Sequence, residues 1–241
     1  MALIFGHRGA SGYAPENTLE AFALAMEMGA DGFELDVHLS KDGELIVIHD
    51  ETVDRTTNGT GRIMDLTLDE IKQLDASNHI PGYKNVRIPT LGEVYDLVRD
   101  TTHMINVEIK TDNIFYPGLL QKCLALEMEK EMQGRIIYSS FNHYTMMELK
   151  QVSPHSKAGL LYEAIIPDPW HYAKLLGADF VHPSVANAFV TDLVKNTLEN
   201  GIGVNLWTVN DPDAMRECLK YDMGIITNYP DIAVSRRNNT K

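Results

Sequence analysis

The chain has 241 residues, of which 44% are hydrophobic and 23% are charged, enough for a sizeable core in one large domain or two small ones. The net charge of −13 argues against a binder of nucleic acid or of anionic membranes, because such proteins carry a basic surface. No apolar run approaches the ~20 residues that span a bilayer, so no stable membrane association is expected. The first residues lack the basic segment of a signal peptide, which makes the cytoplasm the expected compartment.

Strand-like and helix-like segments alternate from the first residues onward. A short apolar run over residues 3–7 predicts a strand that ends at His7. A loop rich in Gly, Pro and Asn follows it. The next segment, residues 17–29, is predicted to be a helix with Asn17 as its N-cap and Gly29 at its end.

The second strand is followed by a turn and by a segment that breaks the alternation. Gly32–Leu39 alternates apolar and polar side chains, which predicts a strand. Lys41-Asp42-Gly43 is a turn signal, and residues 44–50 follow it as another strand-like stretch. Residues 51–88 are polar and rich in turn residues, and we interpret them as a small insertion after the second strand that covers one rim.

Two capping boxes mark helix starts in and after this insertion. Thr67 is followed three residues later by Glu70, and Thr90 is followed by Glu93. In this motif the hydroxyl and the carboxylate each accept a hydrogen bond from a backbone N–H of the first turn. We therefore expect one helix to begin after each threonine.

The rest of the chain repeats a strand and a helix at regular spacing. Counting these units gives about eight, and ~250 residues is the usual size of a (β/α)₈ barrel. A doubly wound open sheet is the competing fold, but it seldom needs so many units. The sequence therefore predicts a single TIM-barrel domain over residues 1–241. The later strands are expected near residues 104–109, 135–140, 157–162, 179–182, 203–209 and 224–227.

The second strand carries carboxylates on one of its faces. Residues two apart in a strand point to the same side, so Glu34 and Asp36 share a face. Phe33, Leu35 and Val37 take the opposite face and are expected to pack against helices.

Other polar residues fall where predicted strands end. Active sites of barrels gather at the carboxyl-terminal rim, so these side chains are expected to converge there. Each residue taken alone has an ordinary structural interpretation, but several carboxylates that point into a barrel cannot all be solvated and need a cation. Oxygen ligands favour Mg²⁺ or Ca²⁺, and zinc is disfavoured because no HExxH motif or Cys/His cluster is present. The residues concerned are His7, Glu34, Asp36, His49, Glu108, Lys110 and Trp207.

The charges at this rim indicate the kind of substrate. Glu34, Asp36 and Glu108 contribute three negative charges, and a divalent cation returns two positive ones. Arg8 and Lys110 add two more positive charges, which leaves the site near +1. This balance suits a singly charged anion such as a phosphodiester, with the two histidines as general acid and general base.

These motifs together resemble the glycerophosphodiester phosphodiesterase family, in its small soluble bacterial form. The segments that carry the resemblance span nearly the whole chain in the family's order: "GHRGASGYAPENTLEAF", "ELDVHLSKDGELIVIHDETVDRTTNGTG", "VEIK", "SSF", "LWTVN" and "ITNYPD". The resemblance implies a (β/α)₈ barrel with an insertion after the second strand. It also implies metal-dependent hydrolysis of glycerophosphodiesters, such as glycerophosphocholine and glycerophosphoethanolamine, to sn-glycerol 3-phosphate and an alcohol.

The resemblance also implies a role for each site residue. His7 and His49 correspond to the paired catalytic histidines, which in the implied mechanism assist attack by the glycerol 2-hydroxyl and then hydrolysis of a cyclic phosphate. The metal ligands correspond to Glu34, Asp36 and Glu108. The phosphate-contacting cations correspond to Arg8 and Lys110, and the aromatic residues on the glycerol side to Phe141 and Trp207.

Two other functions stay open on the sequence alone. One is hydrolysis of a different phosphodiester, such as a lysophospholipid, which would need an apolar lip around the mouth. The other is a non-catalytic binder of glycerophosphodiesters, which could lose a histidine or carboxylate without penalty. The headgroup, the metal, the histidine that first acts as base and assembly into a homo-oligomer are not determined by the sequence.

Overall fold

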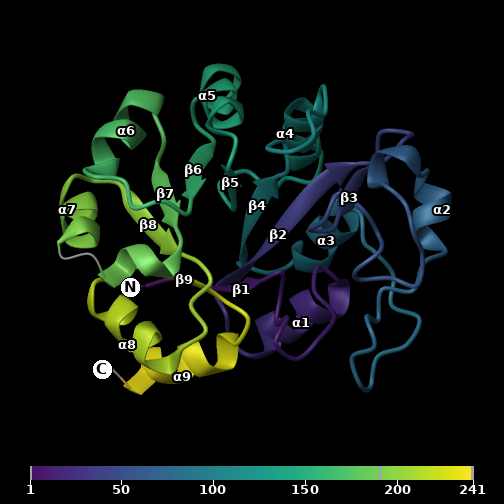
Figure 1. The fold of residues 1–241 in the computed structure, drawn as a ribbon, viewed down its shortest axis with the longest axis horizontal. Coiled ribbons are helices and arrows are strands. Elements are labelled where there is room, and N and C mark those ends of the chain that lie inside the picture. Colours follow the sequence, from purple (N-terminus) through teal and green to yellow (C-terminus); the bar gives the residue numbers. More distant parts are fainter. Residues whose placement is uncertain (1, 190–191, 240–241) are drawn as a thin grey trace.

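Eight parallel strands close into a barrel in the computed structural model, which describes residues 2–189 and 192–239 (Figure 1). The sheet runs in the order β1-β9-β8-β7-β6-β5-β4-β2, and β1 pairs with β2 to close it. These pairings are parallel, so all eight strands end at the same rim. The predicted (β/α)₈ fold is confirmed. The barrel strands are β1 (Ile4–His7), β2 (Gly32–Leu39), β4 (Met104–Ile109), β5 (Ile136–Ser140), β6 (Lys157–Tyr162), β7 (Phe180–Pro183), β8 (Gly203–Leu206) and β9 (Gly224–Thr227).

Helices surround the barrel and alternate with its strands (Figure 1). They bury their apolar faces against the outer side of the sheet, which is the usual packing of parallel strands. The α-helices are α1 (Leu19–Glu27), α2 (Leu68–Lys72), α3 (Leu91–Val98), α4 (Leu119–Glu129), α5 (His143–Val152), α6 (Pro169–Leu176), α7 (Leu193–Glu199), α8 (Pro212–Lys220) and α9 (Pro230–Asn239). The described residues also include the short 3₁₀ helices η1 (Ile63–Asp65) and η2 (Val185–Phe189).

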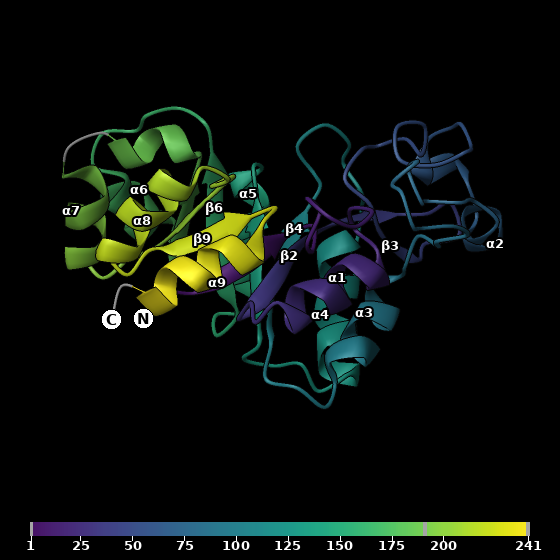
Figure 2. The ribbon, with the colours of Figure 1, turned by 90° about the horizontal axis from the view of Figure 1, so that it is seen from below.

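The segment expected to be an insertion begins after a hairpin. Strand β3 (Leu45–Val47) pairs antiparallel with the end of β2, with Leu39 opposite Leu45. Residues 51–88, which contain η1 and α2, lie at the end of the molecule opposite α7 (Figure 2). Their apolar side chains pack around Ile63 and Ile71 in a cluster separate from the main core. This segment therefore has its own small core beside the barrel.

The alternation in β2 separates the core from the functional face. Phe33, Leu35 and Val37 are fully buried in the main core, and the ring of Phe33 stacks on Phe22 of α1 with centroids 4.4 Å apart. Glu34 and Asp36 lie on the other face, as strand geometry requires. The predicted division of this strand is confirmed.

Both predicted capping boxes are present, and one of them supports a stability prediction. In α3, Thr90 Oγ1 accepts a hydrogen bond from the Glu93 backbone N–H at 3.2 Å, and Glu93 Oε2 accepts one from the Thr90 N–H at 2.7 Å. We expect Thr90→Ala to lower the free energy of unfolding by about 1 kcal/mol, because one N–H of the first turn loses its acceptor. Denaturant unfolding measures this, with the exposed Thr60→Ala as control. Equal stability of the two variants would contradict the prediction.

The prediction that Asn17 caps α1 is wrong. The N-cap is Thr18, whose Oγ1 accepts a hydrogen bond from the Ala21 N–H at 3.2 Å. Asn17 is buried and has a φ of +56°, a left-handed conformation that asparagine tolerates better than most residues. This conformation leaves its side chain available to the functional site.

The two cysteines and the lengths of the helices complete the description of the fold. Cys123 in α4 and Cys218 in α8 are free and buried. In the parts of the chain that the structure describes, no helix has both the length and the apolar character needed to cross a membrane.

Candidate active site

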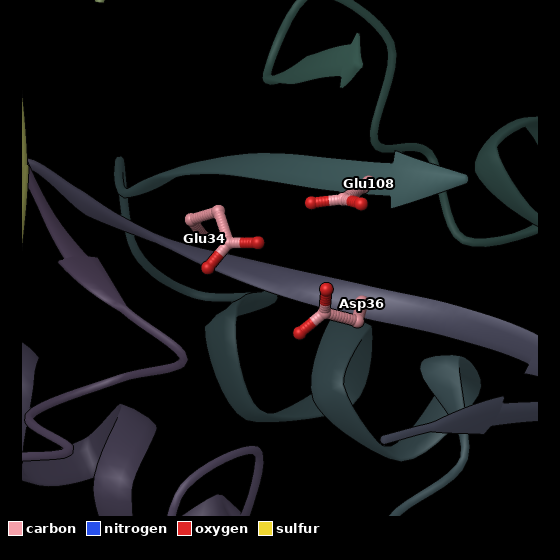
Figure 3. A group of neighbouring side chains, drawn as sticks. All are labelled: Glu34, Asp36 and Glu108. Atoms are coloured by element: carbon pink, nitrogen blue, oxygen red, sulfur yellow. The ribbon is translucent and has the colours of Figure 1, made fainter. Parts of the chain in front are cut away.

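Three carboxylates from two neighbouring strands meet at the rim of the barrel. Asp36 on β2 stands directly opposite Glu108 on β4, and Glu34 lies two residues before Asp36. One oxygen from each of the three lies within 4.8 Å of the others, and all three side chains are buried. Figure 3 shows the three side chains near one another, with Glu34 and Asp36 on one strand and Glu108 on its neighbour. The convergence expected from strand periodicity is therefore present.

Asp36 is held in its charged form by surrounding donors and cations. Burial alone would raise its pKa, but Arg8 above all, with other nearby positive groups, lowers the pKa to about 2. The Arg8 Nε lies 3.5 Å from Asp36 Oδ2, and Asn17 Nδ2 donates a hydrogen bond to the same oxygen at 2.8 Å. The other oxygen, Oδ1, accepts no hydrogen bond from any residue that the structure describes, and Lys110 Nζ lies 3.8 Å from it.

The pKa values of the two glutamates, Glu34 and Glu108, are raised because like charges lie close together. Burial and the neighbouring charges of Asp36 and Glu108 raise the pKa of Glu34 well above its ordinary value. Burial and Asp36 raise the pKa of Glu108 to about 7, although Lys110 Nζ donates a hydrogen bond to Glu108 Oε1 at 2.8 Å. Buried carboxylates that repel one another, with an oxygen of Asp36 free of hydrogen bonds, fit a divalent cation with oxygen ligands, as Mg²⁺ and Ca²⁺ prefer.

His7, at the end of β1, is fixed by an amide. Its Nδ1 donates a hydrogen bond to Asn228 Oδ1 at 2.7 Å, because an amide oxygen can only accept. Burial and the adjacent Arg8 lower the pKa of His7 to about 4. The ring is therefore neutral near pH 7, and its Nε2 is the nitrogen that can accept a proton.

His49, just beyond β3, is fixed by a carboxylate instead. Its Nδ1 donates to Asp50 Oδ1 at 2.7 Å, which again leaves Nε2 for the site. Its backbone carbonyl accepts a hydrogen bond from Nε2 of the buried His38 at 3.0 Å. His38 thus supports the backbone at His49 through this hydrogen bond.

A small cavity brings the catalytic candidates together. It has a volume of about 50 Å³, and the rings of Phe141 and Trp207 meet edge to face in its wall with centroids 5.5 Å apart. A wider, open cavity shares His49, Phe141 and Leu161 with it and is also lined by Lys110. The structure therefore gathers the nine predicted site residues in one place. The small cavity is lined by His7, Arg8, Glu34, His49, Asn106, Glu108, Phe141, Leu161, Trp207 and Ile226.

Several residues of the site were missed from the sequence. Asn17 was interpreted only as a cap, and Asp50 was passed over although it directly follows His49. Asn228 comes immediately after β9, so the rule that strand ends carry functional side chains could have found it. The buried Asn106, on the same face of β4 as Glu108, could have been found from strand alternation.

Comparisons with known proteins match the chain to the family that its motifs resemble. The model of the Glycerophosphoryl diester phosphodiesterase family matches residues 7–232. A glycerophosphodiester phosphodiesterase of Caldanaerobacter subterraneus subsp. tengcongensis is 45% identical over 235 residues, 97% of this chain and 96% of the relative. One of Bacillus altitudinis is 39% identical over the full length of both chains.

Solved structures give the same result. An Oleispira antarctica phosphodiesterase in complex with the product sn-glycerol-3-phosphate is 29% identical, with a TM-score of 0.87 over 99% of this chain and 97% of that one. The glycerophosphodiester phosphodiesterase of Agrobacterium tumefaciens is 30% identical, with a TM-score of 0.86 over 98% of this chain and all of the other.

Proposed function

Because the chain belongs to the glycerophosphoryl diester phosphodiesterase family, we propose that it uses His7, His49 and a divalent cation to hydrolyse glycerophosphodiesters to sn-glycerol 3-phosphate and an alcohol. The family consists of phosphoric diester hydrolases, and glycerophosphocholine and glycerophosphoethanolamine are the substrates we expect. The observation that carries the proposal is the meeting of three buried carboxylates and two histidines at one barrel rim.

Glu34, Asp36 and Glu108 would hold the cation, with Mg²⁺ and Ca²⁺ as the candidates. When bound, the cation supplies positive charge that polarises the phosphodiester. Arg8 and Lys110 add two positive charges that attract the phosphate oxygens. Phe141 and Trp207 form the apolar side of the cavity, where the carbon atoms of glycerol would lie.

The partners of the two histidines support an order of proton transfer. His7 is neutral and hydrogen-bonded to an amide, so it acts first as the base. His49 donates its Nδ1–H to the Asp50 carboxylate, which fixes the orientation of the ring and leaves Nε2 toward the site, so it acts first as the acid. The sequence left this order open.

In the first step the glycerol 2-hydroxyl oxygen forms a bond to phosphorus, and the bond from phosphorus to the leaving oxygen breaks. His7 Nε2 takes the hydroxyl proton, and His49 Nε2 gives its proton to the departing alcohol. Water then opens the cyclic phosphate, with His49 taking a proton from water and His7 returning one to the 2-oxygen. The neighbour solved with sn-glycerol-3-phosphate supports this choice of product.

A panel of glycerophosphodiesters tests the proposal. The purified protein is supplied with Mg²⁺ or Ca²⁺, and sn-glycerol 3-phosphate is measured with a coupled dehydrogenase. We expect product from glycerophosphocholine and much less from a lysophospholipid. Calorimetric binding of glycerophosphocholine without product would contradict the proposal and favour a non-catalytic binder.

The wider cavity predicts a preference for cationic headgroups. It is lined by His49, the proposed acid for the leaving alcohol, and its wall includes the carboxylates Glu51, Asp112 and Glu163. Because exposed charge pairs contribute about 0.2–1 kcal/mol, we expect Glu163→Gln to lower kcat/KM about threefold for glycerophosphocholine and to leave glycerophosphoglycerol unchanged. The matched control is Glu129→Gln on α4. An equal effect on both substrates would contradict the prediction.

Some expectations from the sequence stay predictions. These are the single-domain organisation of residues 1–241, the cytoplasmic location and the absence of nucleic-acid binding. Assembly into a homo-oligomer is a further prediction of this kind, and size-exclusion chromatography with light scattering measures it.

A further inference from the structure

An arginine outside the predicted site contacts the carboxylate behind His49. Arg55 Nε donates to Asp50 Oδ2 at 2.7 Å, and its Nη2 donates to Asp50 Oδ1 at 3.0 Å. Asp50 Oδ1 also accepts the hydrogen bond from His49 Nδ1 at 2.7 Å. One guanidinium edge therefore fixes both oxygens of the group that orients His49.

The same guanidinium reaches the phosphate-binding side of the site. Arg55 Nη1 donates to Glu16 Oε2 at 2.8 Å, and Nη2 donates to Glu16 Oε1 at 2.8 Å. Glu16 Oε1 also accepts a hydrogen bond from Arg8 Nη1 at 2.8 Å. A continuous series of charged hydrogen bonds thus runs from His49 to Arg8, with Arg55 at its centre.

Stability alone does not account for this arrangement. The Arg55 side chain is 45% exposed, and ion pairs at such positions contribute about 0–1 kcal/mol. The bidentate hydrogen bonds from Arg55 instead fix the orientation of the two carboxylates, because a planar guanidinium can bind both in this way only in one orientation. Hydrogen bonds from Arg55 also hold the pKa of Asp50 below its ordinary range, so that Asp50 stays an acceptor for His49 Nδ1–H.

Arg55 comes from residues 51–88, the segment with its own small core beside the barrel. Asp50 follows β3, and Glu16 lies in the loop between β1 and α1. The contact therefore joins two loops at one side of the rim, the one that follows β3 and the one that follows β1. It gives the inserted segment a part in the site although none of the nine predicted site residues lies within that segment.

We propose that Arg55 is a positioning residue of the phosphodiesterase reaction, which orients His49 through Asp50 and, to a smaller extent, Arg8 through Glu16. This rests on the proposed function, and in particular on proton donation by His49 to the leaving alcohol. A correctly positioned general acid accelerates a reaction about 10²–10⁴-fold. If the His49 ring is displaced, part of this acceleration is lost.

The test is Arg55→Gln, with Arg62→Gln as matched control because Arg62 lies in the same segment and has a similarly exposed ion pair. We expect Arg55→Gln to lower kcat for glycerophosphocholine roughly 10–100-fold, with a much smaller change in KM. The kcat of Arg55→Lys should lie between those of Arg55→Gln and the wild-type protein, because an ammonium group cannot form bidentate hydrogen bonds to both carboxylates. Arg62→Gln should match wild type, and the Tm of both variants should stay close to the wild-type value.

Two further readouts separate positioning from a structural effect. With a 4-nitrophenyl ester of glycerol 3-phosphate, whose leaving group needs no proton, Arg55→Gln should slow the first turnover by less than about threefold. In a His49→Ala background, Arg55→Gln should lower the remaining turnover of glycerophosphocholine by less than about threefold, because its main effect acts through His49. Asp50→Asn should give the same pattern, and it provides the test if Arg55→Gln does not fold.

The outcomes distinguish this inference from the proposed function. If Arg55→Gln equals Arg62→Gln, or if its effect is the same on both leaving groups and adds fully to that of His49→Ala, Arg55 is not a positioning residue, while the proposed function stands. If the wild-type protein makes no sn-glycerol 3-phosphate from any glycerophosphodiester, the proposed function fails and this inference fails with it.

Discussion

Replacing His7 or His49 by alanine is expected to lower turnover of glycerophosphocholine by about 10²–10⁴-fold, the usual contribution of a positioned acid or base. Each ring lines the small cavity and has Nδ1 engaged by a fixed acceptor, Asn228 Oδ1 or Asp50 Oδ1. Steady-state formation of sn-glycerol 3-phosphate measures the loss. His155→Ala, at an exposed position, is the control and should match wild type.

The two variants should differ when the leaving group changes. With a 4-nitrophenyl ester, loss of the acid matters little in the first step, so His49→Ala should release nitrophenolate nearly as fast as wild type in the first turnover. His7→Ala should be slow with either substrate, because the 2-hydroxyl still needs a base. Near-normal turnover of glycerophosphocholine in either variant would refute paired-histidine catalysis, and the opposite leaving-group pattern would reverse the assigned order.

The carboxylates of the site could be predicted because strand geometry is regular. A period of two places Glu34 and Asp36 on one face whatever the surrounding loops do. Parallel pairing then brings Glu108 of β4 level with Asp36, since strands in a closed barrel end at one rim. These parts of the site depend only on backbone repeats, which are visible in the order of residues.

The supporting residues could not be predicted because loop conformations determine them. Asn17 and Thr18 are both good N-caps, and only the left-handed backbone at Asn17 decides that Thr18 caps the helix while Asn17 binds Asp36. Arg55 contacts Glu16, 39 residues earlier in the chain, only because the inserted segment folds back on the rim. No periodicity in the sequence specifies such a contact.

Removing the divalent cation is expected to abolish activity and to lower the Tm of the wild-type protein. The change in Tm should depend on Glu108. EDTA should reduce turnover more than about 100-fold, and Mg²⁺ or Ca²⁺ should restore it. The cation should also raise the wild-type Tm, because it binds the folded carboxylate cluster and not the unfolded chain. In Glu108→Gln the Tm should respond weakly to either cation, because one of three oxygen ligands has lost its charge.

In EDTA, Glu108→Gln should be at least as stable as the wild-type protein. The direction in which wild-type stability changes with pH follows from the pKa of Glu108. Its pKa rises from 4.5 to about 7 in the folded state, so the wild-type protein loses stability as the pH rises through this range and the group is forced to ionise beside Asp36. The variant cannot ionise there. Its Tm should therefore exceed the wild-type Tm by more at about pH 8 than at about pH 5. Calorimetry measures both, with Glu129→Gln as control. Activity that persists in EDTA, together with a Tm indifferent to cations, would show that the three carboxylates hold no metal.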